Sequence, residues 1–163
     1  MYLLLQSKEP LTLLAKSLAE EVHEGQLTKH GEPLPYVEAH VAKVVEVCQN
    51  WYPNANQPNH LVLPLTWLHD SVEDTKDKWA TIAKIRGLSF DLLQEVLTLT
   101  KFKYETRGLT NHHYNVQLVG ASWVAQWVKL CDVHVNTRDI ADKSPEFAPL
   151  YLEEKKEQLG CLY

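Results

Sequence analysis

The sequence predicts an all-α fold, an irregular single-domain helical bundle that spans residues 1–163. Apolar residues recur at spacings of three and four along most of the chain, as they do on the buried face of a helix. Segments with the period-two alternation of a strand are nearly absent. Glycine- and proline-containing segments separate the apolar stripes, and 163 residues are enough to bury one hydrophobic core.

The first half of the chain contains three apolar stripes. We expect helices at residues 10–23, 36–51 and 61–72. The segments 25–34 and 53–60 are rich in glycine, proline and asparagine, and are expected to be loops. Pro64 is compatible with the third helix only in its first turn, because proline lacks the backbone N–H that a helix interior needs.

The second half continues the pattern with shorter elements. We expect helices at residues 77–86, 90–100, 111–119 and 122–140, and a last helix that Pro145 opens. Ser89 is a suitable N-cap for the helix over 90–100. The segment 101–110 is polar and turn-like, and the charged run EEKKEQ at 153–158 is expected to form a solvent-exposed helix face.

The amino-acid composition argues against several classes of function. The net charge of -5 and the pI near 5.9 argue against binding to a nucleic-acid polymer or an anionic membrane through bulk charge. The three cysteines form no close-spaced pair, which favours reduced thiols and a cytoplasmic protein. The apolar run at 1–6 is too short for a signal peptide or a membrane span. The sequence does not determine the oligomeric state, and a homo-oligomer is one of the alternatives.

Four ionisable groups are concentrated in the segment HDSVEDT at 69–75. On a helix, His69 would neighbour Glu73, and Asp70 would neighbour Asp74. The segment itself contains no lysine to balance the three carboxylates, and the first one after it is Lys76. Packed carboxylates beside a histidine are expected to bind a cation.

Two further expected helices each contribute polar residues beside their apolar stripes. Asp132 borders Cys131 and Val135, and Asn136 follows one turn later. A buried aspartate is unfavourable unless it is paired, hydrogen-bonded or bound to a metal. His40 lies beside the apolar positions of its own helix. Histidine nitrogen together with carboxylate oxygen suits Mn²⁺, Fe²⁺ or Zn²⁺ better than Ca²⁺.

In this order, His40, His69-Asp70 and Asp132 resemble the HD superfamily of metal-dependent phosphohydrolases. HDSVEDT is similar to the HDxVEDT motif of the RelA/SpoT-type hydrolase domain and of small alarmone hydrolases. VKLCDVHVNTR at 128–138 resembles the VKLADRLHNMR of that family, and LTLTK at 97–101 resembles its LTK stretch. HEGQ at 23–26 with HGEP at 30–33 is similar to its segment HxGQxRKxGxPY.

This resemblance, which covers roughly residues 15–140, implies an HD-type fold and a set of residue roles. It implies that a divalent metal, taken here as Mn²⁺, polarises a phosphate and holds the attacking water. The implied metal ligands are His40, His69, Asp70 and Asp132. Glu73 and Asp74 would position or deprotonate the water. The implied substrate-binding residues are Lys29, Tyr36, Asn136 and Arg138. Lys129 could face phosphate or solvent.

The implied activity is hydrolysis of the 3′-pyrophosphate of (p)ppGpp- or (p)ppApp-like alarmones, with a small phosphorylated nucleotide as substrate. Thr28 replaces the base-stacking arginine of the family, which leaves the base open. One alternative is an HD phosphohydrolase for another phosphorylated nucleotide, for example at the 2′-phosphate of NADPH. Another is a non-catalytic nucleotide-binding module. The retained Glu73-Asp74 pair argues against the module, since binding alone would not require both carboxylates.

Overall fold

A computed structural model describes residues 9–51 and 59–162, and within these residues the chain is helical with no strand. An isolated antiparallel bridge pairs Leu27 with Pro35. The prediction of an all-α fold is therefore confirmed. The helical elements are α1 (Glu9–Val22), the π-helical turn η1 (Val37–Val41), α2 (Ala42–Trp51), α3 (Val62–Leu68), α4 (Lys78–Leu88), α5 (Phe90–Leu99), α6 (Arg107–Val119), α7 (Trp123–Thr137), α8 (Ile140–Lys143) and α9 (Ala148–Leu159).

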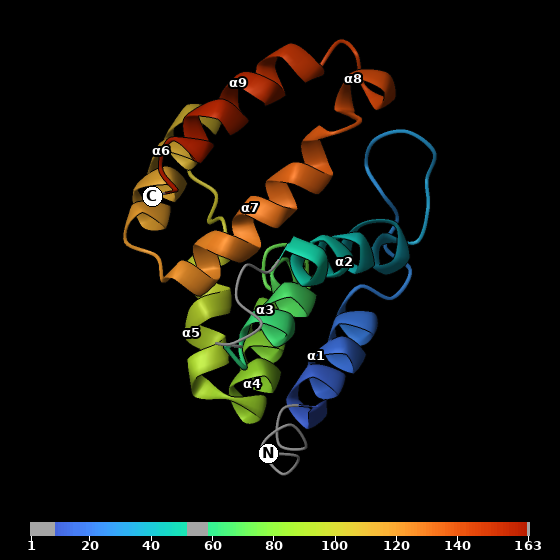
Figure 1. The fold of residues 1–163 in the computed structure, drawn as a ribbon, viewed down its shortest axis with the longest axis vertical. Helices are drawn as coiled ribbons and strands as arrows, with labels where there is room; N and C mark the ends of the chain where they lie inside the picture. The colour runs from blue at the N-terminus through green and yellow to red at the C-terminus, as the bar shows by residue number, and fades with distance from the viewer. Residues whose placement is uncertain (1–8, 52–58, 163) are drawn as a thin grey trace.

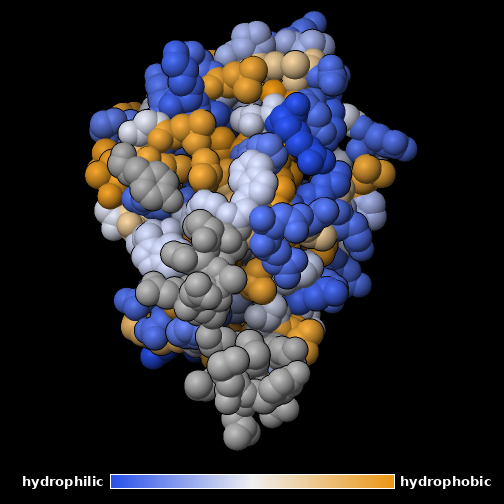
Figure 2. Space-filling model, viewed as in Figure 1, coloured by the Kyte–Doolittle hydropathy of each residue, from blue (hydrophilic) through white to orange (hydrophobic). Residues whose placement is uncertain are grey.

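Helix α7 lies at the centre of the arrangement. It packs against α2, α3 and α5 on one side and against α8 and α9 on the other. Figure 1 shows α7 running diagonally between the group α1–α5 and the group α6, α8 and α9. The face of the molecule in Figure 2 is mostly hydrophilic on its right, whereas hydrophobic residues gather at the upper left, over α6 and α9.

The core consists of the apolar stripes that the sequence shows. Leu65 and Leu68 of α3, Leu92 of α5 and Val128 of α7 are completely buried within one cluster. Burying a leucine side chain stabilises a fold by roughly 1.5–3 kcal/mol, so these residues fix how α3, α5 and α7 pack together. The core thus holds the elements from which the polar residues of the site project.

Side-chain caps begin several helices. Ser89 accepts a hydrogen bond from the Leu92 backbone N–H at 3.2 Å, which confirms it as the N-cap of α5. Ser122 accepts from Ala125 N–H at 3.1 Å and begins α7 in the same way. These oxygens satisfy backbone donors that the first turn of a helix leaves unpaired. Where a helix begins is therefore set by local chemistry.

The predicted helix at 61–72 is too long. Helix α3 ends at Leu68, and His69–Glu73 form a series of turns. Ser71 N–H donates to Leu68 O at 3.0 Å and Asp74 N–H to Asp70 O at 3.1 Å, so the turns close on their own backbone. The polar side chains of this segment therefore project from turns rather than as ladders on a continuous helix.

Other element boundaries also differ from the prediction. Helix α6 begins at Arg107 rather than near 111, because Thr106 caps it by accepting from Leu109 N–H at 3.1 Å. Helix α7 ends at Thr137, and the short α8 follows. The last helix begins at Ala148, with Pro149 rather than Pro145 in its first turn.

Some predictions fall outside the described residues. The apolar run at 1–6 does so completely, and the loop at 53–60 does so for residues 53–58. The assignment of residues 1–163 to a single domain stays a prediction. No helix within the described residues is both long and apolar enough to cross a membrane.

Candidate metal centre

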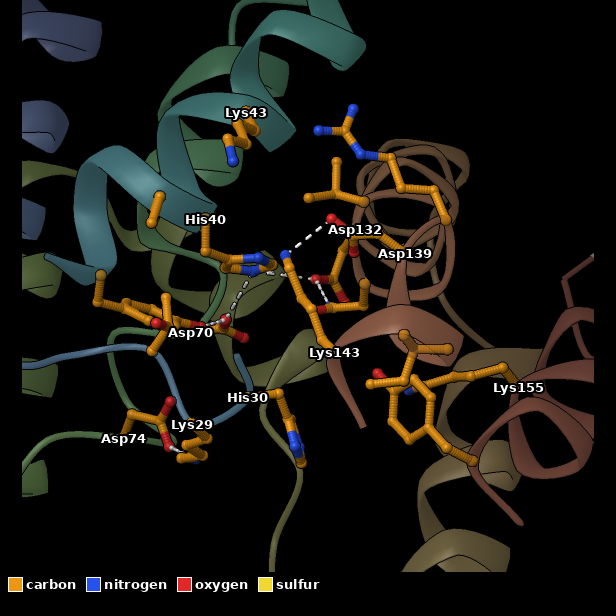
Figure 3. A pocket seen from close by; sticks show the side chains of 18 of the residues that line it. Lys29, His30, His40, Lys43, Asp70, Asp74, Asp132, Asp139, Lys143 and Lys155 are labelled. Carbon is orange, nitrogen blue, oxygen red and sulfur yellow. Dashed lines mark hydrogen bonds and ion pairs between the residues drawn. The ribbon is translucent and has the colours of Figure 1, made fainter. Parts of the chain in front are cut away.

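Side chains from three separate elements meet at one point beside α7. His40 comes from η1, His69 and Asp70 come from the turns after α3, and Asp132 comes from the middle of α7. One ligand atom from each of these residues lies within 4.8 Å of the others. Figure 3 shows His40, Asp70 and Asp132 converging at the base of a pocket. The structure thus brings together all four predicted metal ligands.

The two histidine Nε2 atoms face the two carboxylates closely. His40 Nε2 lies 3.4 Å from Asp70 Oδ2 and 3.2 Å from Asp132 Oδ1. His69 Nε2 lies 3.1 Å and 3.6 Å from the same two oxygens. Neither Nε2 atom forms a well-aligned hydrogen bond, although both are buried. Two buried nitrogens and two oxygens that point to one centre fit a divalent metal ion, which would satisfy all four.

Neighbouring groups orient the ligand atoms. His69 Nδ1 lies 2.7 Å from the Thr66 carbonyl oxygen, so a proton on Nδ1 donates there and the Nε2 lone pair faces the centre. The Tyr36 hydroxyl donates to Asp70 Oδ2 at 2.5 Å. Asn136 Nδ2 donates to Asp132 Oδ1 at 2.6 Å. Tyr36 and Asn136 therefore hold two of the predicted metal ligands, Asp70 and Asp132, as well as lining the pocket.

The electrostatics favour charged groups at this buried point. Burial alone would lower the pKa of His40 and His69, but Asp132 and Asp70 raise the pKa of both rings. Burial alone would raise the pKa of Asp70, but His69 and His40 lower it. The metal-free site therefore favours protonated histidines and ionised aspartates. A cation would displace the protons on the two rings and bind both the rings and the carboxylates.

The backbone around His40 departs from a regular helix. The prediction treats 36–51 as one helix, whereas residues 37–41 form the π-helical turn η1 before α2 begins. In this turn the Ala42 N–H donates to the Val37 carbonyl, five residues back. Single π-helical turns are frequent at functional sites because the extra residue redirects side chains. Here the turn contains the buried His40.

Glu73 and Asp74 line the pocket next to the metal ligands. Glu73 Oε2 accepts from the Lys101 backbone N–H at 3.1 Å. Burial and the nearby Asp70 charge raise the pKa of Glu73. Asp74 is oriented by two donors at 3.3 Å each, Gln26 Nε2 and Lys29 Nζ. The Asp74 contact therefore explains how Lys29, which is otherwise exposed, lies at the pocket edge.

The pocket has a volume of about 380 Å³, within the usual size range of small-ligand sites. Among the ten predicted site residues, only His69 does not line it, because His69 lies behind the others. Lys129, whose direction the sequence left open, lines the pocket and donates to Asp132 Oδ2 at 2.7 Å.

Several residues that the sequence did not single out also belong to the site. Basic and aromatic side chains on the far wall are Lys101, Arg107, Tyr114, Phe147, Tyr151 and Lys155. Lys155 and the buried Gln158 belong to the run 153–158, so the prediction that this run is a solvated face is wrong for both residues. Helix α9 turns this side toward α7, and a tertiary contact of that kind leaves no signal in a charged run.

His23 is a buried structural residue. Its Nδ1 lies 2.7 Å from Gln26 Oε1, and the Gln26 amide continues to Asp74. Burial lowers the pKa of His23, so the ring is neutral near pH 7. His23 and Gln26 both belong to the segment HEGQ at 23–26, but nothing in their spacing indicates that they support Asp74.

Comparison with known proteins identifies the fold. No protein-family model and no curated protein sequence matches the chain. Among solved structures, the chain is similar to a metazoan ortholog of SpoT that hydrolyzes ppGpp and plays a role in starvation responses. The TM-score is 0.75 at 24% sequence identity, and the match covers 93% of this chain and 85% of the other. At that identity, the similarity establishes the fold.

Proposed function

We propose that this chain is a metal-dependent phosphohydrolase that removes pyrophosphate from the 3′ position of a (p)ppGpp- or (p)ppApp-like nucleotide in the cytoplasm. The observation that carries the proposal is the convergence of His40, His69, Asp70 and Asp132 at the base of a nucleotide-sized pocket. The shared fold with a SpoT ortholog, and the HDSVEDT motif at the same site, support the choice of substrate.

The four converging residues would hold the metal, for which we propose Mn²⁺. A bound divalent ion supplies Lewis acidity toward a phosphoryl oxygen and lowers the pKa of a bound water. Mixed imidazole and carboxylate ligands suit Mn²⁺, Fe²⁺ and Zn²⁺. Tyr36 and Asn136 would keep Asp70 and Asp132 in the orientation that binding requires.

Glu73 is the proposed general base. Its Oε2 accepts from the Lys101 backbone, which leaves Oε1 to take the proton of the attacking water. Burial raises the pKa of Glu73, and a carboxylate with a raised pKa accepts a proton more readily. Water attacks the phosphorus next to the ribose 3′ oxygen, and the bond between that phosphorus and that oxygen breaks. The 3′ oxygen takes up a proton to become a hydroxyl, and pyrophosphate is released. Asp74, held by Gln26 and Lys29, would position the water.

Arg138 and Lys29 provide positive charge at the pocket edge for the nucleotide and its phosphates. Thr28 lines the pocket, but its hydroxyl is engaged within its own loop. Its Oγ1 donates to the Glu32 carbonyl at 2.9 Å and accepts from Leu34 N–H at 3.1 Å, so the side chain is used within its own loop. Thr28 therefore offers the base neither a stacking surface nor a free hydroxyl, and we propose that other residues select the base.

The test is pyrophosphate release by the purified protein with Mn²⁺ from ppGpp, ppApp and NADPH. Pyrophosphate from ppGpp or ppApp, lost in Glu73→Gln with metal still bound, is the expected result. Free phosphate from NADPH alone would move the activity to another phosphorylated nucleotide. Metal binding without any product from these compounds would contradict the proposed reaction and favour a binding module.

A further inference from the structure

The far wall of the pocket carries a group of basic side chains that the proposed hydrolysis does not use. Lys101 follows α5, Lys129 belongs to α7 and Lys155 belongs to α9, and all three line the pocket. Figure 3 shows Lys155 on the side of the pocket opposite Lys29 and Asp74. The pocket therefore has cationic groups on both sides of the metal ligands.

Carboxylates neutralise some of these cations but not all. Arg107 is paired with Glu154, with Nη2 and Oε2 2.6 Å apart. Lys129 is paired with Asp132. Within the described residues, Lys155 has no carboxylate at ion-pair distance: its Nζ donates to the neutral Gln158 Oε1 at 3.1 Å and lies 5.1 Å from the Tyr151 ring centre. Lys101 donates to the neutral Asn111 Oδ1.

The surroundings make the charge on Lys155 unfavourable in the empty pocket. Burial, together with the charge of Lys129, lowers the pKa of Lys155 to about 7. Burial also lowers the pKa of Lys101. The charge of Glu73 opposes this shift, and the charge of Lys129 adds to it. In the part of the chain that the structure describes, neither of these two half-buried lysines has a carboxylate at ion-pair distance, so an anion placed between them would stabilise their charge.

We propose that Lys155 and Lys101 form a second anion subsite, which binds a phosphoryl group of the substrate other than the one that is hydrolysed. This inference rests on the proposed function and adds to it, because it requires a nucleotide that is phosphorylated at two separate positions. The ligand is a phosphoryl group because three oxygens on one centre accept from several lysine donors at once. Lys155 would then determine the preference for a nucleotide that carries this second phosphoryl group. Lys129 is less available for it, since it is already paired with Asp132.

The test compares guanosine 3′,5′-bisphosphate with guanosine 3′-monophosphate, and the two adenosine counterparts, by calorimetric titration of the Mn²⁺-loaded protein. The wild type should bind the bisphosphate at least about tenfold tighter than the monophosphate. In Lys155→Met this advantage should disappear. In Lys156→Met, the neighbour on the exposed side of α9, it should persist.

Three outcomes would overturn the subsite. The first is a Lys155→Met protein that keeps the bisphosphate advantage. The second is equal weakening of both ligands, which would indicate a distorted pocket. The third is inorganic phosphate that binds in a Lys155-dependent manner without any bisphosphate advantage, which would assign the site to a free anion. The titration measures binding and needs no turnover. If Lys155 is required for tighter binding of the bisphosphate but the protein releases no pyrophosphate, the proposed hydrolysis is contradicted and the subsite is not.

Lys155→Arg gives an independent readout through pH. The charged and titratable groups near Lys155 are Lys129, Asp132, Lys101, Asp70 and Tyr151. An anion favours the protonated lysine, so the bisphosphate advantage should fall as pH rises above about 7, by up to about tenfold per pH unit. Arginine stays charged, so the variant should keep its advantage across the same range. An identical fall in both proteins would exclude Lys155 as its cause.

Discussion

Several neighbouring groups stabilise the buried carboxylate of Asp132. Oδ1 faces both histidines and accepts from Asn136, whereas Oδ2 accepts from Lys129. Burial alone would raise the pKa of Asp132, but Lys129 and the histidines lower it well below the usual value. Asp132 is therefore ionised and ready to bind a cation.

Asn136→Ala tests how much this orientation matters. Without the amide, Asp132 Oδ1 loses a donor at 2.6 Å, and the affinity for Mn²⁺ should fall by about 10- to 100-fold. The measurement is a Mn²⁺ titration of the metal-free protein. Asn50→Ala, an exposed change on α2, should leave the affinity unchanged. Equal affinity in Asn136→Ala and the wild type would show that Asp132 needs no help from Asn136.

The histidines make metal binding depend on pH. Without metal, Asp70 and Asp132 raise the pKa of His40 and His69 above the usual value of 6.5, so both rings keep protons that a metal must displace. Mn²⁺ affinity should therefore fall as pH decreases through the raised pKa values, and binding near pH 7 should release protons. Calorimetry in buffers of different ionisation enthalpy measures that release. Affinity that is constant between about pH 6 and 8 would contradict the assignment.

At the scale of elements, the sequence predicts helices better than it predicts where they end. Periodic apolar residues identify α1, α5 and α7, because burial on one face forces that spacing. The end of α3 at Leu68 and the π-helical turn at His40 depend on local backbone hydrogen bonds, which periodicity does not report. The cluster of His40, His69, Asp70 and Asp132 could be predicted because the residue types and their order are distinctive.

The far wall of the pocket was not predictable in the same way. Lys155 looks like any solvated lysine in a charged run, and only the packing of α9 against α7 brings it to the pocket. Tyr36 was predicted to line the pocket, but its hydrogen bond to Asp70 depends on a contact between distant segments. A residue whose role depends on a contact between distant segments cannot be recognised from the local sequence pattern around it.

Ser89→Ala tests the cap of α5. The serine oxygen satisfies Leu92 N–H, and its loss should reduce the free energy of unfolding by about 1 kcal/mol. Urea unfolding measures the change. Ser17→Ala, an exposed position within α1, should change it by less than about 0.5 kcal/mol. Because Ser89 lies outside the pocket, Mn²⁺ affinity should be unaffected, and a large loss of affinity would show that α5 positions the site.

At the scale of the whole molecule, the metal centre links η1, the turns after α3, and α7. A metal that binds only the folded state stabilises it by about 2.7 kcal/mol at a free concentration of 100 times Kd. Addition of Mn²⁺ to the chelated protein should therefore raise Tm by several degrees. Asp70→Ala should show no such increase. A Tm that does not respond to Mn²⁺ in the wild type would contradict the metal centre.

The separation of the ligands along the chain has a consequence for how the protein matures. His40, His69 and Asp132 are far apart in sequence, and they meet only after α7 has packed against α2 and α3. A newly made chain therefore offers no complete site to a metal until most of it has been synthesised. Binding of the proposed metal is therefore expected to follow assembly of the core rather than to initiate folding.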